Sequence, residues 1–433
     1  MTWRVSDLPW CNPLVMAGRV PSETDCWVLF YSGMVGAAGS RYSILALEPL
    51  EEAIDYTFKA FDKKLTSDQA RYENFWAGYL GYGLKHQLER LPQDQPGQLT
   101  MPDLWMVRFG VVVVFDHCTE TVQCWSANGR IPDYLLQEVP APPQAASPHV
   151  ASLLSNMIRS EYLAHVQAIR EAIFRGDLYQ ANLTRKFFGE LQQEVDAFSL
   201  FRKLTEISPA PYSALLKLGD NAVLSSSPER FLTVTPDGAM TTTPIKGSAP
   251  RGKTEAEDAA IAYALAHSTK DRAENLMIVD LMRNDLSRSA VAGSVEVASL
   301  FDVTQYSTVY HLSSTITAQK RPEVSTLEAV QACFPPGSMT GAPKIKAMEV
   351  CTALEQQARG IYSGAIGWFG GDGAADLSVV IRTLILHGRQ FEFQVGGGVV
   401  ADSSPENEWQ ETLIKARALA SLLGIEELAL ATL

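Results

Sequence analysis

Two segments of the sequence each carry a pair of acidic residues at helical spacing. Asp271 and Glu274 lie three residues apart in one segment, and Glu408 and Glu411 in the other. Side chains at this spacing share one face of a helix. The simplest interpretation is a solvated acidic stripe, with Glu411 paired to Lys415 along its helix. The alternative is a Mg²⁺ site, because this ion is usually bound by one or two carboxylates, a substrate anion and water.

A lysine and a glutamate stand at positions suited to acid–base or covalent chemistry. Lys246 follows a strand-like run and precedes Gly247, which predicts a backbone bend that another molecule can approach closely. An exposed lysine there is usually solvated, and a nucleophilic one must be neutral, which burial or a nearby cation favours by lowering its pKa. Glu229 precedes a predicted strand, and burial would keep its carboxyl protonated as a general acid.

Other familiar motifs are incomplete. The segment 337–344 is similar to a phosphate-binding loop, but its glycines are one residue too close and Pro343 precedes the lysine. The glycines at 364–371 do not form GxGxxG, and no GxSxG occurs in the chain. The histidines lack metal-ligand spacing. Nucleotide binding, serine hydrolase chemistry and zinc binding therefore have no support.

The elements that must position these residues come in blocks of strands and blocks of helices. Hydrophobic periodicity predicts helices near 50–64 and at 160–175, 254–283, 326–332 and 406–423. It predicts strands at 26–31, 42–47, 108–115, 121–125, 213–218, 230–235, 364–369, 377–387 and 390–396. Because strands and helices do not alternate strictly, the predicted fold class is α+β, with largely antiparallel sheets flanked by helices.

The last acidic pair lies on a helix whose start and buried face can be predicted. Ser403 or Ser404 is a suitable N-cap, and Pro405 suits the first turn. The apolar stripe of this helix consists of Trp409, Leu413, Ala416 and Ala420. We therefore expect its two glutamates to lie beside the buried face rather than within it.

Composition describes an acidic chain with a large core. Lys and Arg number 36 against 49 Asp and Glu, so the net charge is −13, and 46% of the 433 residues are apolar. This composition excludes wholesale disorder and a basic nucleic-acid surface, so any anion site must be built from a few placed donors. Six cysteines are too sparse for a disulfide scaffold, and no apolar run approaches the length of a membrane span. We expect a cytoplasmic protein with mostly buried thiols.

A proline-rich segment predicts a division of the chain. Four prolines lie between Pro140 and Pro148, where neither a helix nor a central strand tolerates them. The predicted organisation is an N-terminal region at 1–139, a linker at 140–149 and a C-terminal region at 150–433 that carries the candidate chemistry.

Seven motifs occur in order and point to one family. They are SSSPERF at 225–231, PIKG at 244–247, DRAENLMIVDLMRNDL at 271–286, FPPGSMTGAPK at 334–344, YSGAIG at 362–367, IRT at 381–383 and GGGVVADS at 396–403. Together they closely resemble the chorismate-utilising enzymes, of the anthranilate synthase component I type, and within that family most closely component I of aminodeoxychorismate synthase. The resemblance implies one intertwined sandwich of two sheets.

The family resemblance assigns roles to the acidic pairs and to a set of substrate-binding residues. It implies that Glu274 and Glu411 hold Mg²⁺, which binds the ring carboxylate of chorismate, with Asp271 and Glu408 close behind. It implies that Arg382 binds the enolpyruvyl carboxylate, which suits a planar guanidinium. The other residues that it places at the substrate are Tyr362, His311, Gly247, Gly396, Gly397 and Gly398.

Lys246 distinguishes members of the family. Aminodeoxychorismate synthases resemble this sequence in having the lysine, whereas anthranilate synthases have alanine there. The resemblance implies that Lys246 attacks C2 of the ring while Glu229 protonates the departing C4 hydroxyl, and that ammonia then adds at C4. The product is 4-amino-4-deoxychorismate, a precursor of 4-aminobenzoate and folate. Mg²⁺ and Arg382 nearby would favour a neutral Lys246. Ser248 departs from the family's usual threonine.

Alternative functions remain open from the sequence. Anthranilate synthase component I is the next candidate, followed by isochorismate synthase, which lacks a close match to the run at 271–286. A third possibility is a binding subunit without activity that senses a ligand in its N-terminal region.

The resemblance also predicts partners. The chain has no cysteine motif for glutamine hydrolysis, so ammonia is expected from solution or from a separate glutamine amidotransferase subunit, component II. Family members can hold tryptophan in an N-terminal pocket, and the segments 27–33 and 41–45 match the strands that line it. The sequence does not decide whether this pocket binds tryptophan, nor the oligomeric state.

Overall fold

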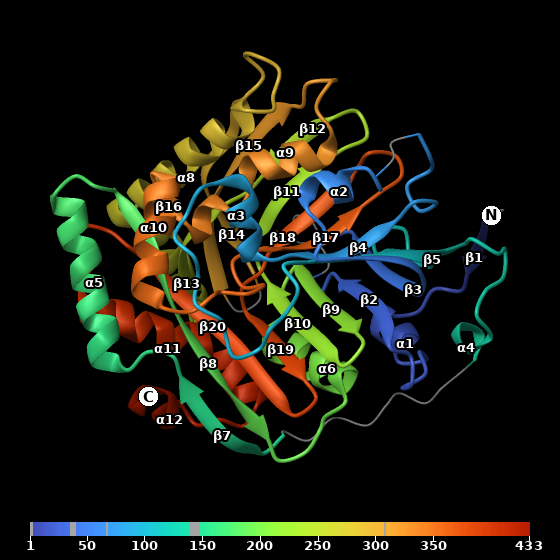
Figure 1. Ribbon diagram of the computed structural model, residues 1–433, viewed down its shortest axis with the longest axis horizontal. Coiled ribbons are helices and arrows are strands. Elements are labelled where there is room, and N and C mark those ends of the chain that lie inside the picture. The colour runs from blue at the N-terminus through green and yellow to red at the C-terminus, as the bar shows by residue number, and fades with distance from the viewer. Residues whose placement is uncertain (1–2, 35–39, 66–67, 138–147, 307–308) are drawn as a thin grey trace.

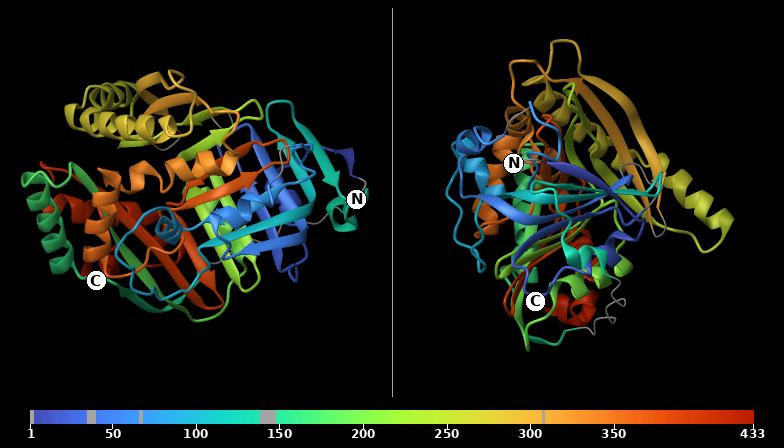
Figure 2. Two further views of the ribbon diagram at one scale, coloured as in Figure 1. Left: turned by 45° about the horizontal axis from the view of Figure 1, so that its top comes forward. Right: turned by 90° about the vertical axis from the view of Figure 1, so that its right-hand side faces the viewer.

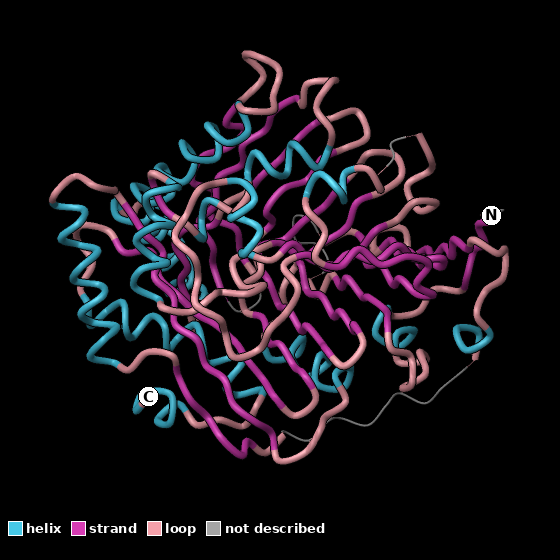
Figure 3. The backbone as a smooth tube through the Cα atoms, viewed as in Figure 1, coloured by secondary structure: helices cyan, strands magenta, loops and turns pink. Residues whose placement is uncertain are grey.

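Two antiparallel sheets joined through two long strands form the body of the protein. The computed structural model describes residues 3–34, 40–65, 68–137, 148–306 and 309–433. Strands β3 (Tyr42–Ile54) and β5 (Leu104–Asp116) pair along almost their whole length. One end of this strand pair belongs to the first sheet, and the other end belongs to the second. The pair therefore connects the two sheets. Figure 3 shows the strands filling the middle of the molecule and the helices lying around them.

The first sheet carries strands from both halves of the chain. From one edge to the other its order is β7 (Val150–Ser155), β8 (Gln180–Leu191), β20 (Gln390–Val399), β19 (Thr383–His387), β10 (Asn221–Ser227), β9 (Tyr212–Leu218), β2 (Cys26–Tyr31), β3, β5, β6 (Thr121–Ser126) and β1 (Arg4–Leu8). The short strand β16 (Gly341–Ala342) also pairs with β8.

The second sheet leaves β5 through β4. Its order is β4 (Trp76–Leu80), β17 (Ala365–Phe369), β18 (Ala375–Val379), β11 (Arg230–Val234), β12 (Ala239–Thr242) and β15 (Val309–Gln319), and β15 also pairs with β13 (Ile245–Pro250) and β14 (Glu296–Gln305). The pairs β2–β9 and β4–β17 join the segments before and after the predicted linker. The N-terminal and C-terminal parts therefore share both sheets.

The helices cover the outer faces of the two sheets. They are α1 (Pro13–Ala17), α2 (Phe58–Asp62), α3 (Lys85–Leu88), α4 (Asp133–Leu136), α5 (Arg159–Phe174), α6 (Ala197–Ile207), α7 (Glu255–Ala266), α8 (Thr269–Ser287), α9 (Thr326–Cys333), α10 (Lys344–Glu355), α11 (Pro405–Leu422) and α12 (Glu427–Thr432). Short 3₁₀ turns occur at η1 (Tyr82–Leu84) and η2 (Gly337–Met339). Figure 1 shows α5, α11 and α12 on one side of the molecule and α2, α8 and α9 on another.

Three apolar clusters hold these layers together. One lies between the sheets and includes Val28, Val107 and Ile366, all essentially inaccessible. A second packs the first sheet against α5, α6 and α11, and a third packs the second sheet against α2, α8 and α9. Figure 2 shows α7 and α8 at the periphery in both views, and α7 buries only Leu265. The core is therefore divided between the packing of the two sheets against each other and the packing of helices on each sheet.

The predicted α+β class with largely antiparallel sheets is confirmed, but three predicted elements are wrong in part. The helix near 50–64 is the end of β3 followed by the short α2, because Ala53 is buried while Leu50 and Ile54 are exposed. This is the alternation of a strand. The helix at 254–283 is two helices, α7 and α8, since Ser268 caps a new helix by accepting from the N–H of Asp271.

The strand at 377–387 is also divided. It forms β18 and β19 around a bend in which Arg382 has a positive φ of 50°. The predicted linker at 140–149 lies outside the described residues as far as residue 147, so that boundary stays a prediction. The described cysteines are all free thiols, four of them buried. No described helix is both long and apolar enough to cross a bilayer.

Candidate active site

The site lies where β8, β13 and β20 meet helices α8 and α11 (Figure 1). A Cβ placed on Gly398 would lie 3.1 Å from Nζ of Lys246 and 2.7 Å from Nε2 of Gln180. A Cβ placed on Gly397, one residue earlier, would lie 2.7 Å from Oε2 of Glu408. Glycine at these two positions of β20 therefore lets a lysine and a carboxylate approach the backbone from opposite faces of one strand.

Lys246 occupies the bend that its neighbouring glycine predicted. Gly247 has φ +93°, a left-handed conformation that a side chain would strain. The Lys246 side chain is partly exposed, and none of the described residues accepts a hydrogen bond from Nζ. Burial lowers the pKa of Lys246, Glu274 opposes that change, and Lys415 adds to it. Burial and a neighbouring cation both favour the neutral amine, as the nucleophile hypothesis requires.

Glu229 is a buried carboxyl facing the same space. Its side chain is 5% exposed, and it accepts hydrogen bonds from the Ser338 hydroxyl and the backbone N–H of Ile245. Burial raises the pKa of Glu229 to about 7, although Ser338 and Lys246 act in the opposite direction. A substantial fraction of this group is therefore protonated at neutral pH, which is the state required of a general acid.

The acidic pair of α8 faces the bend that carries Lys246. A Cβ on Gly247 would lie 3.0 Å from Cγ of Asp271, so the carboxylate packs directly on this glycine. Glu274 is 15% exposed, and burial raises its pKa while Lys246 lowers it. The negative charge of Glu411, on the other helix, also raises the pKa of Glu274. The carboxylates of the two acidic helices therefore lie near enough for their charges to interact.

One residue of the acidic pair of α11 is more buried than its sequence indicated, whereas the Glu411 side chain is 43% exposed. Glu408 is 3% exposed, so the expectation that both glutamates lie beside the buried face is wrong for this residue. The close approach to Gly397 makes room for it, and the Ser403 hydroxyl donates to its Oε1 at 2.6 Å. Ser404 is the N-cap but forms no side-chain capping bond. Burial raises the pKa of Glu408, and its Oε2 has no protein partner.

Lys415 contacts both Glu411 and strand β20. Its Nζ lies 2.5 Å from Oε1 of Glu411 and donates to the carbonyl of Gly396 at 2.8 Å. Burial acts to raise the pKa of Glu411, but Lys415 outweighs it and the pKa is lowered. The helix ion pair anticipated for these two residues is present; its side chains are 44% and 43% exposed, and it adjoins Gly396 of the site.

The carboxylates fit a divalent cation that prefers oxygen ligands. Among the described residues, no three His, Cys, Asp or Glu side chains are packed closely enough to complete an ion site alone. Two facing carboxylates, with the orphaned buried Oε2 of Glu408 behind one of them, suit an ion completed by substrate and water. Mg²⁺ has this preference, whereas zinc would require nitrogen or sulfur ligands.

Arg382 and His311 form a second part of the site. No described residue accepts a hydrogen bond from the Arg382 guanidinium, which leaves its donors for an anion. Burial lowers the pKa of Arg382. Burial, with a further contribution from Arg382, lowers the pKa of His311 to about 3, so the imidazole is neutral. Ser248 and Nδ1 of His311 are hydrogen-bonded at 2.6 Å, so the serine in place of threonine keeps this contact. Tyr362 is 5% exposed, and burial raises its pKa.

Three side chains of this site were missed from sequence. Gln180 is fully buried with neither amide atom bonded to protein, Ser338 donates to Glu229, and Lys415 spans Glu411 and Gly396. Gln180 and Ser338 are uncharged residues that no spacing rule selects. Lys415 was visible only as a helix ion pair.

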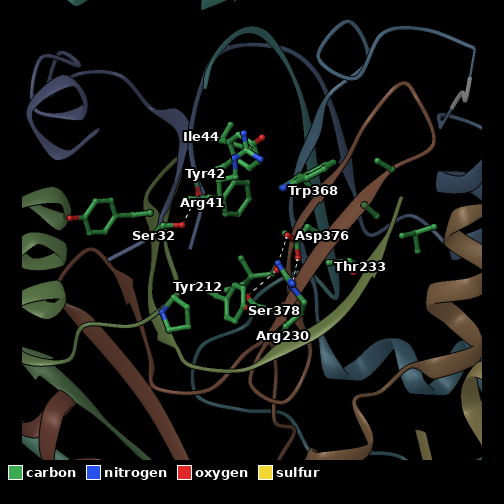
Figure 4. A pocket seen from close by; sticks show the side chains of 18 of the residues that line it. Ser32, Arg41, Tyr42, Ile44, Tyr212, Arg230, Thr233, Trp368, Asp376 and Ser378 are labelled. Carbon is green, nitrogen blue, oxygen red and sulfur yellow. Dashed lines mark hydrogen bonds and ion pairs between the residues drawn. The ribbon is translucent and has the colours of Figure 1, made fainter. Parts of the chain in front are cut away.

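A separate hollow opens between the two sheets (Figure 4). It has a volume of about 320 Å³ and is lined by β2 and β3 together with β9, β11, β17 and β18. Phe30 to Ser32, Arg41, Tyr42 and Ile44 contribute to its wall, and all lie in the two segments at 27–33 and 41–45. On its floor Arg230 donates to Asp376 at 3.1 Å and lies over the Tyr212 ring at 5.1 Å.

Comparison with known proteins identifies the family. The sequence model of the family described as chorismate binding enzyme matches residues 34–421. The chain belongs to the chorismate binding enzymes. Its first 33 residues, with β1 and β2, and its last 12 lie outside the match, which includes every candidate site residue.

Several chorismate binding enzymes resemble the chain over most of its length. Aminodeoxychorismate synthase component 1 of Escherichia coli is 36% identical over 431 residues, covering 97% of this chain and 94% of that protein. Aminodeoxychorismate synthase of Streptomyces griseus is 42% identical over 364 residues, which are 80% of this chain but 50% of that protein. The chain therefore spans about half the length of this second relative.

A solved structure of another chorismate binding enzyme has the same fold. Anthranilate synthase component I from Streptococcus pneumoniae superposes with a TM-score of 0.78 and 28% sequence identity, covering 90% of this chain and 93% of that one. The predicted family and the intertwined two-sheet fold are confirmed.

Glu229 makes the stability of this chorismate binding enzyme depend on pH. Because burial raises its pKa to about 7, the folded state holds a proton that the unfolded chain releases above its ordinary value of 4.5. Stability is therefore lost as pH rises between these values, and Glu229→Gln avoids that loss. The difference in unfolding free energy, variant minus wild type, should grow by about 3 kcal/mol from pH 4 to pH 8. Urea unfolding at both pH values measures it, and an unchanged difference would contradict the buried acid.

Proposed function

We propose that the chain is component I of aminodeoxychorismate synthase, a transferase that converts chorismate and ammonia to 4-amino-4-deoxychorismate. The observation that carries the proposal is the pairing of Lys246, whose Nζ lies beside Gly398, with the buried carboxyl of Glu229: burial lowers the pKa of the lysine and raises that of the acid, and each charge affects the other. Similarity to aminodeoxychorismate synthases of Escherichia coli and Streptomyces griseus supports it.

The first half-reaction joins substrate and enzyme. The lone pair of the neutral Lys246 amine forms a bond to C2 of the ring. The C1=C2 double bond moves to C1=C6, the C5=C6 double bond moves to C4=C5, and the C4–O bond breaks. Glu229 donates its proton to the departing oxygen, which leaves as water, and the ammonium formed at Lys246 loses a proton to solvent. The buried, protonated carboxyl and the neutral amine are the two states that this step consumes.

The second half-reaction releases the lysine. The lone pair of ammonia forms a bond to C4, both double bonds return to C5=C6 and C1=C2, and the bond between C2 and the Lys246 nitrogen breaks. One proton of the added nitrogen passes to the Glu229 carboxylate, and the leaving amine takes up a proton from solvent. The sum of both halves is chorismate plus ammonia giving 4-amino-4-deoxychorismate plus water, with both residues regenerated.

The remaining residues bind and orient chorismate. Arg382 has free donors for the enolpyruvyl carboxylate, with Tyr362 and the backbone amides of Gly396 to Gly398 beside it. The neutral imidazole of His311 offers a hydrogen-bonding edge without a charge. Gly247 keeps the backbone open next to Lys246. Glu229, His311 and Tyr362 are themselves buried, which limits the access of water to the ring.

Glu274 and Glu411 would hold Mg²⁺, with Asp271 and Glu408 supporting them. When bound, the ion supplies the positive charge that offsets the ring carboxylate of the substrate. Two neighbouring residues orient the carboxylates of α11. Ser403 fixes Glu408, and Lys415 fixes Glu411 against the carbonyl of Gly396. Two carboxylates from separate helices leave coordination positions for the substrate.

Two further partners belong to this proposal. The ammonia would come from glutamine through a separate amidotransferase subunit, component II, as the name component 1 of the Escherichia coli relative supports. The hollow between the sheets would accept tryptophan, because its aromatic walls suit an indole and the Arg230–Asp376 pair offers both charges to an amino acid. The product of the proposed amination would enter the formation of 4-aminobenzoate and folate.

The product of the reaction tests the proposed function directly. The protein incubated with chorismate, Mg²⁺ and ammonium, followed by the lyase that forms 4-aminobenzoate, should yield 4-aminobenzoate on chromatography. Anthranilate as the main product would instead assign the chain to anthranilate synthase, the activity in the name of the Streptococcus pneumoniae protein of the same fold. Isochorismate formed without ammonium would assign the third candidate activity.

The covalent intermediate provides a second test. Wild-type protein mixed with chorismate and Mg²⁺ without ammonium should gain the mass of chorismate minus water, on a peptide containing Lys246. Lys246→Ala should lose both the adduct and at least about 10³-fold in kcat, since the nucleophile is gone. Lys270→Ala is the control, because this lysine lies beside Glu274 but is 60% exposed. An adduct that persists in Lys246→Ala rejects Lys246 as its site.

Tryptophan binding can be measured by calorimetry on the metal-free protein. A single site is expected, and Asp376→Asn should weaken binding by about tenfold, because it removes the negative charge from the Arg230 pair on the pocket floor. Heat of binding that is absent in the wild type, or unchanged in Asp376→Asn, would contradict tryptophan at this position.

A further inference from the structure

A single buried arginine connects three separate segments of the chain. Arg359 lies between α10 and β17 and is 2% exposed. Its Nη1 donates to the carbonyl of Met339 at 2.8 Å and to the hydroxyl of Ser363 at 3.2 Å. Its Nη2 donates to the carbonyl of Asn182 at 2.7 Å. The guanidinium plane also lies over the Tyr82 ring at 4.6 Å.

The remaining donors are taken by a buried carboxylate. Nε and Nη2 of Arg359 donate to the two oxygens of Glu355 at 2.8 and 2.7 Å. Glu355 also accepts from the backbone N–H of Thr184 in β8 at 2.9 Å. Every N–H of the guanidinium therefore has an acceptor, in a fork that a lysine cannot reproduce. A buried pair with this geometry fixes position more than it adds stability.

Each of the three segments holds a residue of the candidate active site. Met339 follows Ser338, whose hydroxyl donates to Glu229. Ser363 follows Tyr362. Asn182 lies opposite Gly398 in the pairing of β8 with β20. Arg359 touches none of the groups that would react, but the backbone beside each of these residues is attached to it.

We infer that Arg359 is a positioning residue for the proposed amination, which holds the turn η2 so that the hydroxyl of Ser338 reaches Glu229. The inference rests on the proposed function. It extends that function by naming a residue outside the substrate site on which the general acid depends. Arg359 also holds Ser363 and Asn182. It therefore sets the separation between Tyr362 and strand β20.

The consequence for Glu229 has a definite sign. The groups that face its carboxyl are Ser338 from η2, the N–H of Ile245 and the amine of Lys246 from β13, and Lys415 from α11, and all of them lower its pKa against the effect of burial. Loss of the Ser338 hydrogen bond leaves burial less opposed, so the pKa rises. The protonated acid then persists to higher pH, and the fall in activity on the alkaline side occurs at a higher pH.

The test is the pH profile of kcat/KM for chorismate, with Mg²⁺ saturating and free ammonia held constant at each pH. Arg359→Lys retains a charge for Glu355 but cannot bridge the three segments. It should lower kcat at least about tenfold and move the alkaline limb up by about half a pH unit or more. Ser338→Ala should move the limb in the same direction, and the double variant should move it no further than either change alone.

Lys85→Met is the matched control. Lys85 is another buried cation, 1% exposed, which lies 4.5 Å from the same Tyr82 ring and is held by Asp94 and Thr352. None of these partners adjoins a site residue, so the variant should lose stability without moving the limb.

If the alkaline limb of Arg359→Lys lies at the same pH as that of the wild type and only the activity is lower, the inference is overturned. Arg359 is then a purely structural residue. If that variant does not fold, Ser338→Ala decides alone, and an unmoved limb there overturns the inference equally. A wild-type enzyme that makes no 4-amino-4-deoxychorismate refutes the proposed function itself, which the product assay shows independently of any variant.

Discussion

The burial of the Glu229 carboxyl, and in part of the Lys246 amine, is the constraint on which the site depends. Ionised carboxylates and ammonium groups lose hydration free energy when they are buried, so burial favours the neutral form of each. It raises the pKa of Glu229 to about 7 and lowers that of Lys246. The same physical effect, acting on an acid and a base side by side, prepares a proton donor and a nucleophile. The packing of β11, β13 and β20 serves to maintain that effect.

The acidic composition of the chain is compatible with an anionic substrate because charge is arranged locally. The carboxylates of α8 and α11 face one another, and Lys415 reaches between Glu411 and the carbonyl of Gly396. Arg382 stands apart with free donors. Positive charge is therefore present at two points of the cleft although the net charge is −13. A divalent ion between the acidic helices would strengthen the first of these points.

Sequence patterns predicted what periodicity and residue type encode. The two acidic helices, the bend at Gly247 and the antiparallel class follow from spacing, glycine and block order, and the structure contains them. The helix near 50–64 was wrong because Leu50, Ala53 and Ile54 also fit helical spacing, and only pairing with β5 makes them a strand. The burial of Glu408 depends on its contact with Gly397, a residue eleven positions away on another element. Arg359 could not be found from sequence, since its role lies in backbone carbonyls of distant segments.

The central claim is that the Glu229 carboxyl is protonated in the folded protein near neutral pH. Infrared difference spectroscopy between wild type and Glu229→Gln measures it, because a protonated carboxyl has a C=O stretching band separate from that of a carboxylate. At pH 6 the account predicts a carboxylic-acid band present in the wild type and absent from the variant, and it predicts that this band disappears by pH 9. A carboxylate band for Glu229 already at pH 6 would contradict the account, since burial would then not control the charge of this site.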